Sequence, residues 1–217
     1  MTRVFWRLSF ACTASGLALL AQPPAAWPWW DPIWIFVFFI AVYADLAGWA
    51  GLRAARLAAG IAVISLAALL GLGALTGWPV GPLRFTEHSG LRLGGAVPLG
   101  LPLLGFALLT VSGQAAAAAF PGAGKPGLAA GTAAAFLLTV ANGIAFFSVD
   151  RIWWLWNPWG DGPAAGRAAL SLCVLGAVGF ALAFVYPADS RLRLSRWSPG
   201  AIAWVATNAL FLAARLA

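Results

Sequence analysis

Residues 57–75 read L-A-A-G-I-A-V-I-S-L-A-A-L-L-G-L-G-A-L, an apolar run without a single charged side chain. About 20 apolar residues in a helix cross the hydrocarbon core of a membrane. The run lacks the alternation of apolar and polar residues that a barrel strand shows, so it predicts a helix. A helix also satisfies its backbone hydrogen bonds within the segment, which the bilayer requires.

Composition extends this interpretation to the whole chain. Of its 217 residues, 62% are hydrophobic and 9% are charged, whereas soluble domains are about 45–50% apolar and about 25% charged. We therefore expect one all-α integral membrane domain over residues 1–217, a polytopic transmembrane helix bundle with six or seven spans. The expected spans cover residues 4–21, 33–50, 57–75, 96–119, 128–147, 168–186 and 201–213.

Two of these segments leave the number of spans open. The first contains Arg7, and the last is short for a span. The first segment also has an alternative interpretation as a signal peptide that ends near Ala21 and Gln22, because it follows a basic start. The spanning helix remains the preferred interpretation.

The positive charge of the chain predicts its orientation. The net charge is +7, but the arginines are scattered at segment ends without a basic run, so a nucleic-acid partner is not expected. Positive charges favour the cytoplasmic side of a membrane, and a cytoplasmic N-terminus places eight cations inside against five outside. The inner set is Arg3, Arg7, Arg53, Arg56, Lys125, Arg191, Arg193 and Arg196, and the outer set is Arg84, Arg92, Arg151, Arg167 and Arg215.

Two polar loops are expected on the outer face. Residues 78–95 hold the only histidine, His88, beside the acid Glu87, and a later loop holds Asp150 among several tryptophans. These tryptophans fit either an interfacial belt or an aromatic-lined pocket. Glu87 and His88 also have a plain interpretation as a solvated turn. Asp150 and Arg151 have one as an interfacial cap or as the start of a short helix over residues 152–156.

Few polar residues interrupt the expected spans. Asp45 lies within the second span, and an ionisable residue there is a functional hypothesis by default. It either reaches water at the inner interface or pairs with Asn142 or Arg53. Cys12 and Cys173 fall in apolar segments and share no motif, so neither a disulfide nor a metal site is expected.

Residues 76–87 read T-G-W-P-V-G-P-L-R-F-T-E, and residues 149–163 read V-D-R-I-W-W-L-W-N-P-W-G-D-G-P. Together they resemble the signature of the carotenoid-biosynthesis integral membrane proteins that include the carotenoid 1,2-hydratases, of the bisanhydrobacterioruberin and γ-carotene 1′-hydratase type. The resemblance covers about a fifth of the chain. Leu70 stands where that family usually has an acid, and Leu83 and Phe85 stand at its motif tyrosines. The matching positions are Thr76, Gly77, Pro79, Gly81, Thr86, Glu87, Gly90, Leu93, Val97, Pro98, Asp150, Trp154, Trp156 and Pro163.

The resemblance implies acid-catalysed addition of water to the terminal C1,2 double bond of a linear carotenoid, without a cofactor or metal. Glu87 is then the acid, and Asp150 orients the water or acts as the partner base. Residues expected to contact the substrate are Trp78, Phe85, Thr86, His88, Trp154 and Trp156. The expected partners are the apolar isoprenoid or carotenoid, membrane lipid and other carotenoid enzymes, in the bacterial cytoplasmic membrane.

Two other classes of function stay open. The first is a non-catalytic membrane protein that binds or scaffolds an apolar lipid or pigment, for which Glu87 would be replaceable. The second is a small transporter, which needs a polar path through the bilayer. Only Asp45, Gln114, Asn142 and Asn208 are available for such a path, and this small number argues against it.

Overall fold

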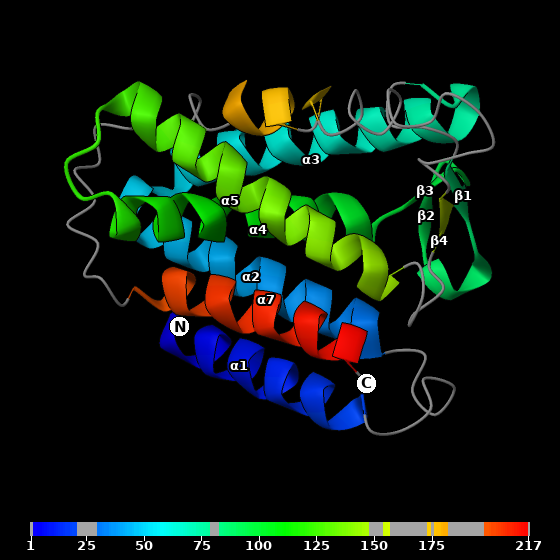
Figure 1. Cartoon of the computed structure of the whole chain (residues 1–217), viewed down its shortest axis with the longest axis horizontal. Helices are drawn as coiled ribbons and strands as arrows, with labels where there is room; N and C mark the ends of the chain where they lie inside the picture. The colour runs from blue at the N-terminus through cyan, green and yellow to red at the C-terminus, as the bar shows by residue number, and fades with distance from the viewer. Residues whose placement is uncertain are drawn as a thin grey trace.

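The computed structural model describes residues 2–20, 30–78, 83–147, 154–156, 173–174, 176–181 and 198–216. Six long helices dominate this part of the chain and run side by side (Figure 1). The expected helical architecture is therefore confirmed. The helices are α1 (Thr2–Leu19), α2 (Trp30–Ala50), α3 (Leu52–Thr76), α4 (Gly100–Ala119), α5 (Lys125–Ala145) and α7 (Pro199–Leu216).

Within the described residues, four helices are long and apolar enough to cross a membrane. They are α2, α3, α4 and the part of α5 from Lys125 to Ile144. Large apolar side chains also point away from the protein, with Ile64 69% exposed and Leu75 77% exposed. Apolar surface of this extent suits contact with lipid rather than with water. The protein is therefore a helical membrane protein.

The other three expected spans, over residues 4–21, 168–186 and 201–213, are not among these four helices. Helix α1 carries Arg3 and Arg7 and is not among the four, and the apolar part of α7 covers only Pro199–Ala214. Of the expected span over residues 168–186, only residues 173–174 and 176–181 lie in the described part, where they are helical.

Several expected boundaries move by up to a turn and a half. The span expected over residues 96–119 begins as a helix only at Gly100, because Val97 and Pro98 form a short strand. Proline has no backbone N–H to donate and suits such an edge position. In the other direction, α3 begins at Leu52 rather than at residue 57, so it includes the exposed Arg53 and Arg56.

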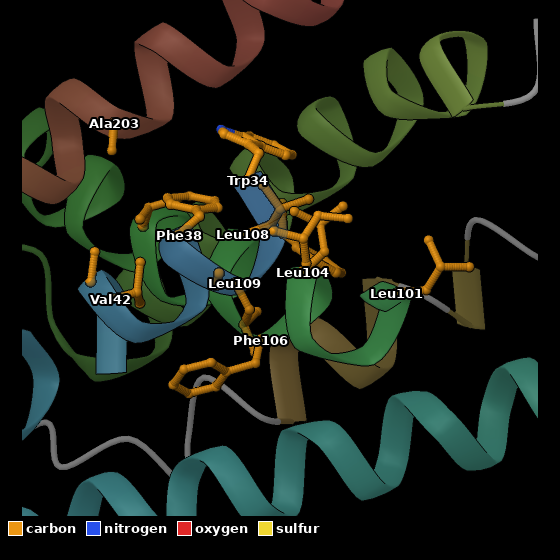
Figure 2. Close-up of a cluster of buried hydrophobic side chains, with 14 of the residues drawn as sticks. Trp34, Phe38, Val42, Leu101, Leu104, Phe106, Leu108, Leu109 and Ala203 are labelled. Carbon is orange, nitrogen blue, oxygen red and sulfur yellow. The ribbon is translucent and has the colours of Figure 1, made fainter. Parts of the chain in front are cut away.

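Helix α4 lies at the centre of the bundle and packs against α2, α3, α5 and α7. Its fully buried Phe106 packs edge-on against Phe39 of α2, with ring centroids 5.5 Å apart. Leu104, Leu108 and Leu109 of α4 belong to the same buried cluster as Trp34 and Phe38 of α2 (Figure 2). Trp34 stacks between Trp30 and Phe38, with ring centroids 5.8 and 5.6 Å apart. This stack on α2 also contacts Phe211 of α7 and Thr13 of α1, so the stack joins these three helices.

Four short strands lie together at one end of the bundle (Figure 1). Strand β1 (Leu83–Phe85) pairs antiparallel with β4 (Trp154–Trp156), and β2 (Arg92–Leu93) pairs antiparallel with β3 (Val97–Pro98). We call residues 83–99 together with β4 the cap. The opposite end, which holds Gly51 between α2 and α3 and the α4–α5 connection at residues 120–124, is called the hairpin end.

Candidate functional site

The cap begins where α3 stops. Gly77 has a left-handed backbone with φ of 71°, and its N–H donates to the Gly73 carbonyl at 3.0 Å. The Thr76 hydroxyl donates to the Leu72 carbonyl at 2.7 Å and accepts from the Trp78 N–H at 3.1 Å. Because glycine adopts positive φ without a steric cost, it is the common residue just beyond a helix C-terminus. The Thr-Gly pair of the first motif is therefore a helix cap.

A second group of motif residues reverses the chain before α4. Gly94 and Gly95 have φ of 56° and 74°, and the Ala96 N–H donates to the Leu93 carbonyl at 3.1 Å. Positive φ at both central residues is the pattern of a type I′ hairpin turn. The turn pairs Leu93 with Val97 and leads through the buried Val97 and Pro98 into α4.

Glu87 lies on a short 3₁₀ helix, η2 (Glu87–Ser89), within the cap. The buried Ser89 closes this turn, because its hydroxyl donates to the Thr86 carbonyl at 2.6 Å and its N–H donates to the same oxygen at 3.1 Å. Glu87 itself is exposed. Its carboxyl therefore faces outward and does not lie in the apolar pocket mouth that the proposed acid chemistry favours.

The other expected contact residues differ in burial. Phe85 packs against the hydrophobic core and is half-buried, as is Thr86, whereas Trp78 is 62% exposed. The His88 backbone lies in η2, and its side chain falls outside the described residues, as do those of Trp154 and Trp156. Asp150 also lies outside the described part of the chain.

The pairing of β1 with β4 joins the two motif-bearing loops. In this register Leu83 lies opposite Trp156, and Phe85 lies opposite Trp154. The prediction that these loops lie on one face is confirmed for their backbones, although about 70 residues separate them in sequence. The alternative of a helix over residues 152–156 is wrong, because residues 154–156 form the strand that completes this pair.

The tryptophans do not form one group. Trp30 and Trp34 are buried in the stack on α2, where the Trp34 Nε1–H donates to the Thr13 hydroxyl at 3.2 Å. Trp78 is exposed beside the cap, as an interfacial residue would be. Neither a common belt nor a common pocket accounts for all three. Trp27, Trp29, Trp153 and Trp159 lie outside the described residues.

A second polar site lies at the hairpin end. Asp45 accepts hydrogen bonds from Trp6 Nε1 at 3.4 Å and from Gln114 Nε2 at 2.8 Å. Gln114, only 2% exposed, accepts in turn from the Ser198 hydroxyl at 3.2 Å. Of the two alternatives for Asp45, pairing with Asn142 or Arg53 is wrong, because Gln114 of α4 meets the carboxylate and Asn142 bonds Asn208. The Asp45 side chain is half-buried, so contact with water at this end stays open.

The two asparagines form a separate cluster between α5 and α7. Asn142 Nδ2 donates to Asn208 Oδ1 at 2.9 Å, and Asn208 Nδ2 donates to the Thr139 hydroxyl at 3.0 Å. Ser198 and Asn208 are ten residues apart on one helix, or about 15 Å along its axis. The four polar residues named for a transport path therefore lie in two separate clusters, Asp45 with Gln114 and Asn142 with Asn208.

Metal ligands do not gather in the described part of the chain, where no group of three His, Cys, Asp or Glu residues could hold an ion. Cys12 and Cys173 are both free, the first half-buried and the second exposed. No known protein family matches this chain, and neither a curated protein nor a solved structure matches it.

Proposed function

We propose that this protein is a carotenoid-biosynthesis membrane protein that adds water to the terminal C1,2 double bond of a linear carotenoid by acid catalysis. The observation that carries the proposal is the pairing of β1 with β4. It joins the two segments in which the resemblance to the carotenoid hydratases lies. An apolar substrate held in the bilayer would meet this cap with one end.

The proposed reaction needs one acid, one base and one water molecule. The carboxylic acid of Glu87 protonates the terminal alkene carbon C2, which leaves a tertiary cation at C1. Water adds its oxygen to C1, and Asp150 takes the proton that the water loses. Aromatic faces stabilise the cation, and Phe85 and Thr86 lie next to Glu87 in the cap. The exposure of Glu87 lets its carboxyl regain a proton from solvent between turnovers.

We further propose six or seven spans, with the N-terminus on the cytoplasmic side of a bacterial inner membrane. The described cations support this orientation, because more of them lie at the hairpin end than at the cap. The cap carries Arg84 and Arg92 in the described part, and Arg215 lies near the C-terminus of α7 at the same end of the bundle. Positive residues favour the cytoplasmic side. The exposed cations at the hairpin end are Arg3, Arg7, Arg53, Arg56 and Lys125.

The test is pigment analysis after expression in a host that makes lycopene. The wild-type chain should yield hydroxylated lycopene, and Glu87→Gln should lower its formation by about 100-fold or more, because general acid catalysis typically contributes that factor. Lys125→Gln removes an exposed charge at the opposite end and is the matched control, with activity near that of wild type. An unchanged pigment profile, with the wild-type protein present in the membrane, would refute the hydratase proposal.

The exposure of Glu87 and Trp78 favours a second candidate, a non-catalytic protein that binds an apolar lipid or pigment at the cap. For such a protein, Glu87→Gln should leave pigment binding intact. Trp78→Ala should lower the amount of pigment that purifies with the protein. Other enzymes of carotenoid synthesis are the partners that we propose for either role.

A further inference from the structure

The intramembrane carboxylate of Asp45 has no part in the proposed reaction, and it lies at the end of the bundle opposite the cap. We propose that Asp45 ends a series of side-chain hydrogen bonds, here called the latch. The latch holds the first turn of α7 and the start of α1 against the central pair α2 and α4. The latch consists of Trp6, Asp45, Gln114 and Ser198, one from each helix or its cap. It requires a negative charge at Asp45.

The direction of each hydrogen bond leads to this requirement. The Ala201 N–H donates to the Ser198 hydroxyl at 3.2 Å, and that hydroxyl donates to Gln114 Oε1. The Gln114 amide is thereby oriented with its NH₂ group toward Asp45 Oδ2. The Trp6 indole, which can only donate, covers Asp45 Oδ1. Donors therefore meet both oxygens, and only an ionised carboxylate accepts at both without presenting a hydrogen of its own.

The latch also caps α7. Ser198 precedes the helix, and its hydroxyl receives the N–H of Ala201 three residues later, the arrangement of a helix N-cap. Pro199 occupies the first helical position, where its missing N–H costs nothing. The N-terminus of a helix carries partial positive charge. The negative charge that we propose for Asp45 is therefore favourable near the partial positive charge at the N-terminus of α7.

Close packing holds the same groups in place. A Cβ atom added at Gly200 would overlap the carboxamide of Gln114. The first turn of α7 therefore lies directly on the amide that bridges Ser198 and Asp45. A larger residue at position 200 would require the Gln114 amide to move, and with it the hydrogen bonds to Ser198 and Asp45.

Charged groups on the surrounding elements do not replace these neutral donors. In the described residues, Asp45 is bonded by Trp6 and Gln114. The cations of α1 and α3 nearest this end, Arg3, Arg7, Arg53 and Arg56, are exposed. Helix α4 has no charged residue, and α7 has only Arg215, at its far end. A charge inside a span is costly unless it is paired or hydrogen-bonded, and Trp6 and Gln114 supply these hydrogen bonds to the half-buried Asp45.

The two native cysteines allow a test on the full-length protein in detergent micelles. Cys12 lies half-buried on α1 and packs against the core, while Cys173 is exposed and serves as the internal reference. Asp45→Asn keeps the shape of the side chain but places an NH₂ group against one of the two donors, Trp6 or Gln114. We expect the rate of maleimide labelling at Cys12, relative to Cys173, to rise at least about fivefold.

Further variants separate the latch from a general loss of packing. Ser198→Ala should raise Cys12 labelling in the same direction, while Ser198→Thr, which keeps the hydroxyl, should restore the wild-type rate. Asn142→Leu breaks the other intramembrane cluster and should leave Cys12 labelling unchanged. If Cys12 is labelled at the wild-type rate in both Asp45→Asn and Ser198→Ala, the proposal is wrong. If Asp45→Asn does not fold, the contrast between Ser198→Ala and Ser198→Thr decides the question alone.

Discussion

The two ends of the bundle treat polar residues in opposite ways. At the cap, Glu87 and Arg92 are exposed and backbone bonds between short strands hold the fold together. At the hairpin end, the Asp45 carboxylate accepts hydrogen bonds from side chains of two other helices, and Ser198 extends this network to the start of α7. Exposed polar groups at an interface keep their contact with water, whereas those within a span must find a partner in the protein. The polar residues that stand out in the sequence lie at the cap, whereas the polar side chains that join helices lie at the hairpin end.

The largest expected effect is at Gly200. Gly200→Ala places a methyl group against the Gln114 amide and should lower the free energy of unfolding by about 2–3 kcal/mol, within the range for an overpacked core. Gly48→Ala is the matched control, because a Cβ there meets nothing within 4 Å. That variant should be as stable as wild type or more so. Denaturation in detergent, followed by circular dichroism, measures both, and equal stability of the two variants would contradict the close approach.

A smaller effect is expected at the asparagine cluster. Asn208→Leu leaves Asn142 and Thr139 without their present partner and should cost about 1–2 kcal/mol. Measured hydrogen bonds inside membrane proteins average about 0.6 kcal/mol, so a larger loss would reflect the buried group left unpaired. The double variant Asn142→Leu with Asn208→Leu should cost less than the sum of the single changes. Strict additivity in this cycle would show that the two amides do not depend on each other.

The smallest effect is expected at the cap. Arg92 Nη2 donates to the Phe85 carbonyl at 3.2 Å, but the side chain is exposed. Arg92→Gln should therefore change the free energy of unfolding by less than about 0.5 kcal/mol, as is usual for surface changes. The same unfolding assay measures this change. A loss comparable to that of Asn208→Leu would mean that the cap also depends on its side chains, and the contrast between the two ends would disappear.

Part of the candidate site could be predicted from sequence because its residues act locally. Thr76 and Gly77 cap their own helix, and Gly94 and Gly95 form their own turn, so neighbouring residues determine both. The exposure of Glu87 on η2 agrees with its interpretation from sequence as part of a solvated turn. The pairing of Phe85 with Trp154 was expected only as a common location, and its strand register follows from contacts between distant segments.

Hydropathy along the chain was sufficient to predict apolar helices in a membrane, because a bilayer penalises every unpaired backbone group wherever it occurs. It also marked Asp45, Gln114, Asn142 and Asn208 as unusual within the spans. Hydropathy does not predict which side chains these four residues hydrogen-bond. A side chain reaches only a few ångströms, so the rotation and contact of packed helices determine that Asp45 meets Gln114 and that Asn142 meets Asn208. Membrane insertion is thus a local property of the chain, whereas the choice of polar partner belongs to the assembled bundle.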